Sequence, residues 1–294
     1  MVKVGIIGSK GQLGSDLART FCFSEVYKIA LFPHESFDVT NRKDYRQLNN
    51  VDIVINTAAY HKVDEVENNP AKAFSINAVA NKHLAEYCAV RDKTLVFIST
   101  DYVFGGDRSR KLPYTEKDKV CPVNTYGISK ATGEMFVRSI APKHYIIRTS
   151  GLFGVEGASG KGGNFVETMI KLAKKRKLVS VVNDWLCPTY TKNLAEQIEI
   201  LIQTNKYGTY HAVSEGGCSW YEFTKEIFKL KNFDVELKSK PHWENYSMVE
   251  RPEYCVLKNA KLNKLGINNM KHWKDALKDY LIEKGHLDKH GINK

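Results

Sequence analysis

The sequence predicts an α/β protein with a doubly wound parallel sheet, because apolar runs alternate with helical patterns over residues 1–150. The apolar runs are rich in Val and Ile at successive positions, which is typical of strands covered on both faces. A glycine-rich turn follows the first run, and a polar cluster follows a later one. Ligands of open α/β sheets bind at the carboxyl ends of the strands, so both features predict binding loops.

The predicted elements follow one another in strand–helix order. In the first half, strands are expected at residues 2–8, 27–32, 52–59, 94–100 and 145–150, and helices at 12–21, 70–90 and 124–140. In the second half, helices are expected at 165–176, 191–203 and 220–230, strands at 179–183 and 208–213, and a flexible glycine-rich loop at 154–164. The looser second half predicts a smaller C-terminal α/β domain.

Composition narrows the class of protein. The chain has 294 residues, of which 43% are hydrophobic and 26% charged, the balance of a soluble globular protein. We expect a cytoplasmic protein without a membrane segment, because no run of about 18 apolar residues and no export signal is present. Six cysteines form no CxxC pair and nine histidines form no HExxH motif, so neither a disulfide framework nor a metal site is expected.

The formal net charge of +11 has more than one interpretation. It is compatible with simple solubility or with attraction of an anionic small molecule. The densest basic run, KLAKKRK at 171–177, lacks the interleaved aromatic residues of a base-stacking surface. We therefore expect no nucleic-acid partner.

The first strand ends in GSKGQLG, which contains Gly8, Gly11 and Gly14. Glycines between a strand and a helix let backbone amides approach a pyrophosphate at the helix N-terminus. The spacing is GxxGxxG, not the more familiar GxGxxG, but its place after the first strand predicts dinucleotide binding. Residues 1–150 are accordingly expected to form an NAD(P)-binding Rossmann domain, and 151–294 a substrate-binding portion from which 190–213 returns to the Rossmann core.

The end of the second strand bears on cofactor choice. His34 and Lys10 would tolerate the 2′-phosphate of NADPH, whereas Glu35 would oppose it. These residues favour NADPH and leave NADH open. Asp38 and Val39, slightly further along, are candidates for contacts with adenine.

Tyr126 and Lys130 are the strongest catalytic candidates. They lie four residues apart on a predicted helix and therefore share a face. A cation beside a phenol lowers its pKa and makes it a usable general acid at neutral pH, and Lys130 could also hold a cofactor ribose. Thr100, at the end of the preceding strand, could hydrogen-bond a substrate carbonyl. Together these residues predict carbonyl reduction.

The glycine loop, strand-end threonine and YxxxK motif resemble the extended short-chain dehydrogenase/reductases. Further stretches resemble the dTDP-4-dehydrorhamnose reductase family, in that family's order and over nearly the whole chain. These stretches are NTAAYHKVDEVE (56–67), INAVANKHLA (76–85), ISTDYVFGG (98–106), PVNTYGISKATGE (122–134), YIIRTSGLFG (145–154), NFVETMIKLA (164–173), VVNDWLCPTYTKNLAE (181–196), GTYHAVSEGGCSWYEF (208–223) and RPEYCVLKNAKL (251–262).

The resemblance implies reduction of the C4 keto group of dTDP-4-dehydro-β-L-rhamnose for cell-surface polysaccharide synthesis. It assigns Tyr126 as the acid that protonates the C4 oxygen. The remaining implied contacts are Gly11, Gln12 and Leu13 with the pyrophosphate, Asp38 and Val39 with adenine, Ala58, Ala59 and Tyr60 along the cofactor, and Thr100 and Asp101 with the sugar.

Tyr102 distinguishes two reactions within this superfamily. Related nucleotide-sugar 4,6-dehydratases carry Asp-Glu after the strand-end threonine, because elimination needs both an acid and a base. This chain has Thr100-Asp101-Tyr102 and lacks the second acid. The sugar-facing cluster of Thr100, Asp101, Tyr102 and Tyr126 therefore indicates a reductase.

Two departures from the family concern the substrate. Gly151 replaces a tryptophan that lines the sugar site, and Lys258 stands where the family tends to have Asp. A reductase of another nucleotide-linked 4-keto-6-deoxy sugar therefore stays open. So does a noncatalytic NADP-binding regulatory subunit like the methionine adenosyltransferase β subunit.

Some family members dimerise through acidic residues and magnesium. Asp16 and Glu196 lie near two such positions without a third, so we expect a monomer or homodimer without metal.

Overall fold

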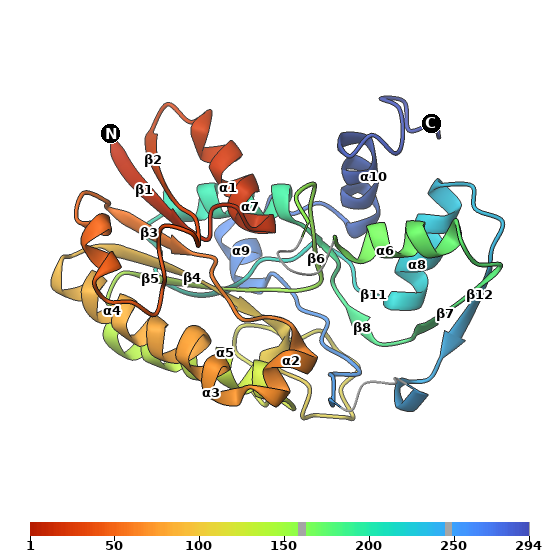
Figure 1. Ribbon diagram of the computed structural model, residues 1–294, viewed down its shortest axis with the longest axis horizontal. Coiled ribbons are helices and arrows are strands. Elements are labelled where there is room, and N and C mark those ends of the chain that lie inside the picture. Colours follow the sequence, from red (N-terminus) through yellow and green to blue (C-terminus); the bar gives the residue numbers. More distant parts are fainter. Residues whose placement is uncertain (158–162, 245–248, 294) are drawn as a thin grey trace.

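A six-stranded parallel sheet forms the centre of the protein, in the order β10-β5-β4-β3-β1-β2 (Figure 1). The computed structural model describes residues 1–157, 163–244 and 249–293. The strands of this sheet are β1 (Val2–Ile7), β2 (Tyr27–Phe32), β3 (Ile53–Asn56), β4 (Thr94–Thr100), β5 (His144–Thr149) and β10 (Gly208–His211). The predicted doubly wound parallel sheet is thus confirmed.

Helices cover both faces of this sheet, as its continuously apolar strands require. The two faces have separate clusters of buried side chains, built on alternate residues of the strands. One face packs against α1 (Gln12–Cys22), α7 (Thr191–Ile202) and α9 (Ala260–Leu265). The other side carries η1 (Asp44–Leu48), α2 (Val63–Asn68), α3 (Pro70–Phe74), η2 (Ser75–Val79), α4 (Ala80–Val90) and α5 (Thr125–Ile140).

Most of the remaining elements surround a further apolar cluster centred on Phe153, Phe223 and Tyr280, whereas Val103 and Phe104 belong to a smaller separate cluster. In Figure 1 most of them lie to the right of the main sheet. They are η3 (Asp101–Val103), β6 (Leu152–Phe153), α6 (Phe165–Ala173), β7 (Leu178–Val182), β8 (Trp185–Leu186), β9 (Thr189–Tyr190), β11 (Cys218–Ser219), α8 (Trp220–Leu230), β12 (Glu236–Lys240), η4 (His242–Glu244) and α10 (Trp273–Glu283). Three two-stranded sheets pair β6 with β9, β7 with β12 and β8 with β11.

Local sequence signals fix the ends of the helices that matter most. Asn124 caps α5 by accepting a hydrogen bond of 2.9 Å from the amide of Gly127. Ser219 and Glu222 form a reciprocal capping box at the start of α8. The strand at 208–213 is shorter than predicted but joins the main sheet as β10, beside β5. Residues 158–162 of the predicted flexible loop lie outside the described residues.

No helix in the described part of the chain is both long and apolar enough to span a bilayer. The six cysteines, all within the described ranges, are present as free thiols.

Candidate active site

The strand order brings the predicted site residues to one edge of the sheet. Strands β1, β3, β4 and β5 are neighbours, and all point the same way. The glycine loop follows β1, Ala58 lies two residues beyond β3, and Thr100 ends β4. The chain leaves β1 for β2 on one side and returns to β3 on the other, which creates the crevice where such sheets bind ligands.

The glycine loop forms a tight cradle at the start of α1. Gly8 has a φ of 76°, and the amide of Gly11 donates to the Gly8 carbonyl over 2.8 Å. A β-carbon on Gly14 would lie only 2.2 Å from that same carbonyl oxygen, so only glycine fits. Gly11 precedes the helix without a side-chain cap, which leaves the first amides of α1 available for an anion.

Gln12 supplies a second sign that the loop is built for a ligand. Its side chain is buried, and its Oε1 atom has no hydrogen-bond partner among the described atoms. A buried acceptor without a donor is costly in a folded protein. The missing partner must be a donor, such as a ligand hydroxyl, whereas the uncapped amides at the start of α1 are the groups that fit the phosphates of a dinucleotide.

The other residues predicted for the cofactor lie along the same edge. Asp38 is exposed, and hydrogen bonds from Thr40 hold the pKa of its carboxyl below the usual value. Val39 is buried, so its side chain serves the core beneath the predicted adenine position. The carbonyl and amide of Tyr60 both pair with the side chain of Asn77, at 2.9 Å each, while Ala58 donates to Asn56.

Lys10 and Glu35 contact each other at 3.3 Å, and both are largely exposed. The lysine that would favour a 2′-phosphate is thus partly neutralised by the glutamate that would oppose it. Such exposed pairs are weak, so a phosphate can compete for Lys10.

Thr100 and Tyr126 come together as predicted from their positions at a strand end and a helix start. The Thr100 side chain faces the Tyr126 phenol, whose ring also packs against that of Tyr102, two residues beyond the strand end. Burial raises the pKa of the Tyr126 phenol above its ordinary value, and the bond to Thr100 opposes that rise. Tyr126 is therefore protonated at neutral pH, but the prediction that Lys130 lowers its pKa is wrong for this structure, because Lys130 is not among the groups that shift it.

Lys130 lies elsewhere than the four-residue spacing suggests. Its Nζ atom donates to the carbonyl of Ile98 over 2.6 Å and stands 4.1 Å from the centre of the Phe97 ring. Burial lowers the pKa of this ammonium to about 7, against the attraction of Glu134. In this structure Lys130 is directed to the floor of the crevice, because a backbone carbonyl competes with the phenol for its protons.

Asp101 is almost completely buried and is surrounded by protein donors. Its Oδ1 atom accepts from Thr100 at 3.0 Å, and its Oδ2 atom accepts from Ser150 at 2.6 Å and from the Cys255 thiol at 2.9 Å. Burial raises the pKa of its carboxyl despite these bonds. Asp101 thus ties β4, β5 and the C-terminal segment together and orients the Thr100 hydroxyl.

Tyr102 stands beside Tyr126, with their ring centres 5.8 Å apart. Arg251 hydrogen-bonds Tyr102 and also reaches Asp64, with distances of 2.9 and 3.0 Å to the two carboxylate oxygens. Sequence reasoning assigned no role to Arg251, although it opens the RPEYCVLKNAKL stretch. Its positive charge opposes the rise that burial causes in the pKa of Tyr102.

Gly151 has a left-handed backbone, with a φ of 52°. A β-carbon there would lie 2.6 Å from Cδ1 of Leu186. A tryptophan does not fit this backbone, and Leu186 occupies the space where its side chain would start. Phe153 is fully buried in the C-terminal cluster and does not replace the missing ring.

No group of three His, Cys, Asp or Glu side chains with metal-binding geometry occurs in the ranges that the structure describes. Asp16 is one of the two acidic residues near the family's magnesium positions. Its carboxylate accepts hydrogen bonds from Arg19 and Thr191.

Comparisons with known proteins agree with this geometry. Residues 2–285 match the family described as the RmlD substrate binding domain. The spore coat polysaccharide biosynthesis protein SpsK of Bacillus subtilis is 35% identical over 288 residues, covering 97% of this chain and 98% of the relative. The dTDP-4-dehydrorhamnose reductase of Aggregatibacter actinomycetemcomitans is 33% identical, covering 95% and 98%.

A solved structure is similar over the same extent. The dTDP-4-dehydrorhamnose reductase of Bacillus anthracis, in complex with NADP, is 37% identical with a TM-score of 0.88, covering 96% of this chain and all of that one. With these similarities across the whole described fold, the chain belongs to the dTDP-4-dehydrorhamnose reductase (RmlD) family.

Proposed function

We propose that this protein reduces the C4 keto group of dTDP-4-dehydro-β-L-rhamnose to give dTDP-L-rhamnose for cell-surface polysaccharide synthesis. The observation that carries the proposal is the placement of Tyr126, at the start of α5, beside the end of β4 that carries Thr100. A carbonyl oxygen placed between them would accept a hydrogen bond from Thr100 and a proton from Tyr126.

Each polar group has a separate task in this reaction. Tyr126 donates its phenolic proton to the C4 oxygen. In this structure the single proton of the Thr100 hydroxyl goes to Asp101 at 3.0 Å, so it would have to turn from that carboxylate to the substrate oxygen. The bound nicotinamide cofactor would supply hydride to C4. Lys130 lines the floor of the crevice, where the Ile98 carbonyl holds its ammonium at 2.6 Å.

The absence of a second acid supports reduction over elimination. Tyr102 has its pKa raised by burial, so it stays protonated at neutral pH and is a poor base for removing a C5 proton. The only proton that reduction consumes comes from Tyr126. The site thus has the groups for one reaction and lacks a base for the other.

We further propose NADPH as the preferred cofactor, with NADH as the alternative. Lys10 and His34 support this preference, while Glu35 reduces it. The glycine loop, Asp38, Val39, Ala58, Ala59 and Tyr60 would line the cofactor.

We also propose a cytoplasmic monomer or homodimer. Size-exclusion chromatography with light scattering would distinguish the two oligomeric states.

The direct test follows absorbance at 340 nm with NADPH, the protein and dTDP-4-dehydro-β-L-rhamnose made in situ from dTDP-glucose. Rapid oxidation of NADPH that is lost in Tyr126→Phe is the expected result. Tyr207→Phe is the matched control, because Tyr207 lies just before the amino end of β10, away from the strand ends that form the site. Folded protein that binds NADPH but oxidises none with this sugar would refute the substrate assignment.

Gly151 favours a second candidate, a reductase of another nucleotide-linked 4-keto-6-deoxy sugar. Glycine stands at 151 in place of the family's tryptophan, and Leu186 occupies the space where that side chain would start. The surface beside the sugar therefore lacks this aromatic ring. Turnover of dTDP-4-keto-6-deoxy-D-glucose, faster than that of the rhamnose precursor, would support it. A noncatalytic regulatory subunit is the remaining alternative; tight cofactor binding without turnover of either sugar would favour that role.

A further inference from the structure

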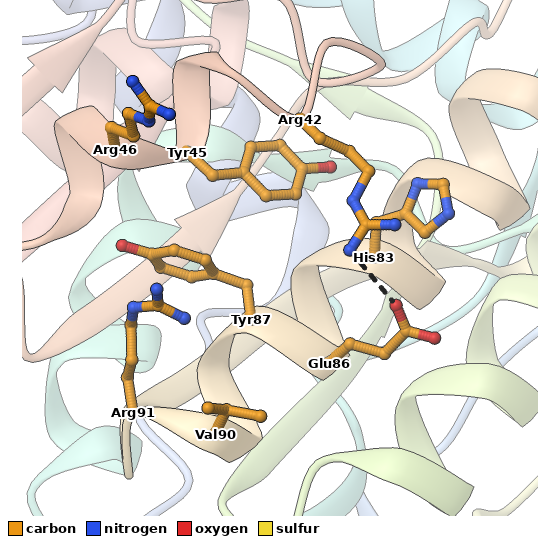
Figure 2. Close-up of a pocket in the computed structure, with 8 residues that line it drawn as sticks. All are labelled: Arg42, Tyr45, Arg46, His83, Glu86, Tyr87, Val90 and Arg91. Atoms are coloured by element: carbon orange, nitrogen blue, oxygen red, sulfur yellow. Dashed lines mark ion pairs between the residues drawn. The ribbon is translucent and has the colours of Figure 1, made fainter.

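A polar pocket lies on the outer side of the Rossmann portion, between η1 and α4 (Figure 2). Its volume is about 290 Å³, at the lower end of the range for small-ligand sites. The lining residues are Arg42, Tyr45 and Arg46 from the η1 side, and His83, Glu86, Tyr87, Val90 and Arg91 from α4 and its end.

The pocket has more positive than negative charge. Three arginines line it, and Glu86 is its one acidic side chain. Glu86 is shared between Arg42, at 4.0 Å, and Lys82, at 3.7 Å. Both contacts are long and partly exposed, so they neutralise the cations weakly. An anion entering the pocket would therefore meet guanidinium charge that Glu86 offsets only in part.

The walls of the pocket are held in place by contacts of their own. The hydroxyl of Tyr45 donates to the carbonyl of Val39 at 2.7 Å, and its ring stacks on Phe37. The hydroxyl of Tyr87 donates to the side chain of Asn49 at 2.8 Å. Arg91 lies flat against Tyr87, with its guanidinium carbon 4.1 Å from the ring centre. A fixed guanidinium loses less freedom on binding than a mobile one.

The pocket is separate from the predicted cofactor and sugar positions. Asn49 and Val51 follow η1 and lead into the start of β3, while Arg91 leads into the start of β4. The ammonium of Lys93 donates to the carbonyls of Asn49 and Val51 and joins these two connections. The pocket thus lies toward the amino ends of the strands, whereas the glycine loop and Thr100 lie at their carboxyl ends.

We propose that this pocket binds a phosphate dianion, either inorganic phosphate or the phosphate group of a small ester. Guanidinium groups recognise phosphate oxygens through paired charge-assisted hydrogen bonds, and Arg42 and Arg91 approach the pocket from opposite sides. His83 adds a further nitrogen donor. The site does not depend on the proposed reductase activity.

Isothermal titration calorimetry would test the proposal on the full-length protein at low ionic strength. NADPH and dTDP would be present at saturation, so that phosphate positions in the active site are already occupied. Inorganic phosphate and glucose 6-phosphate would be titrated separately. Saturable binding at one site per chain is expected, and tighter binding of one probe would identify free phosphate or an ester as the natural form.

Single variants on the two sides of the pocket make the test specific. Arg42→Ala and Arg91→Ala should each weaken binding by about tenfold or more, as loss of a charge-assisted contact predicts. Arg176→Ala removes an equal charge from an exposed position beyond α6 and should leave binding within about twofold. Equal weakening by all three variants, or no saturable binding to the wild-type protein, would overturn the proposal.

Discussion

The carboxylate of Glu134 and the guanidinium of Arg148 form a buried two-point ion pair that links α5 to β5. The Arg148 Nε and Nη2 atoms donate to the two oxygens of Glu134 at 2.9 and 2.7 Å. Ser99, next to Thr100 on β4, adds a bond of 2.6 Å to the same carboxylate. This cluster fixes the helix that carries Tyr126 against the strand that carries Thr100.

Replacing Glu134 by Gln should destabilise the protein by about 3–5 kcal/mol, because it leaves the buried Arg148 charge uncompensated. Urea unfolding followed by circular dichroism would measure the loss. Arg138→Ala is the matched control, since Arg138 contacts the same carboxylate at 3.4 Å from a half-exposed position. Its removal should cost about 1 kcal/mol or less. Similar losses for both variants would contradict this account of the pair.

Gly151→Ala should be more destabilising than Gly266→Ala. Both glycines have positive φ, 52° and 67°, so both substitutions incur backbone strain of about 1 kcal/mol. Only the β-carbon at 151 meets a neighbour, Leu186, whereas the space at 266 is open. The collision should add about 1–3 kcal/mol. Thermal unfolding of the two variants would check the difference, and equal melting temperatures would exclude the steric contribution of Leu186.

Thiol labelling of the native protein should separate the cysteines into two classes. Cys22 and Cys121 are exposed, whereas Cys88, Cys187, Cys218 and Cys255 are buried. Burial and the neighbouring Asp101 carboxylate raise the pKa of the Cys255 thiol well above its ordinary value, so little reactive thiolate forms there. Ellman's reagent should rapidly modify two thiols, and all six after unfolding in guanidinium. Rapid modification of Cys255, identified by mass spectrometry, would contradict the structure.

Because of Lys130, the free energy of unfolding of the unliganded protein should increase as the pH rises from 7 to 9. Its folded-state pKa of about 7 lies below its usual value of 10.5, so in this interval the unfolded chain binds the extra proton. Stability then rises with pH, by at most about 1.4 kcal/mol per unit for one proton. Below pH 7 both states are protonated and the slope vanishes.

Lys130→Met removes this titration, so the wild-type minus variant difference in unfolding free energy should increase between pH 7 and 9. Urea titrations at several pH values would measure that difference. Taking the difference cancels the opposite contribution of the buried cysteines, which both proteins share. Parallel stability curves would show that Lys130 is not held at a depressed pKa.

The main sheet and its helices could be predicted because each element carries its own local signal. The run TLVFIST contains four consecutive apolar residues, Leu95–Ile98, between polar ones, and β4 spans the whole run, Thr94–Thr100. In contrast, β12 has the sequence ELKSK, with little apolar character and mostly exposed side chains. It forms because β7 offers a free edge, which a pattern along the chain does not reveal.

The same contrast between local signals and contacts with distant residues applies to the candidate site. Strand-end and helix-start positions were enough to predict that Thr100 and Tyr126 meet. The orientation of Lys130 was not predictable, because the competing acceptor is the carbonyl of Ile98, 32 positions away. Likewise, Asp101 finds Ser150 and Cys255 at separations of 49 and 154 residues. Such contacts depend on the whole fold.

The Cys255–Asp101 contact also constrains the order in which parts of the site can form during synthesis on the ribosome. Synthesis proceeds from the N-terminus, and β10, an edge of the main sheet, is not made until residue 211. The donor to Asp101 follows some forty residues later. A nascent chain can therefore form the glycine loop early, but Thr100 acquires its final surroundings only after residue 255 has been made.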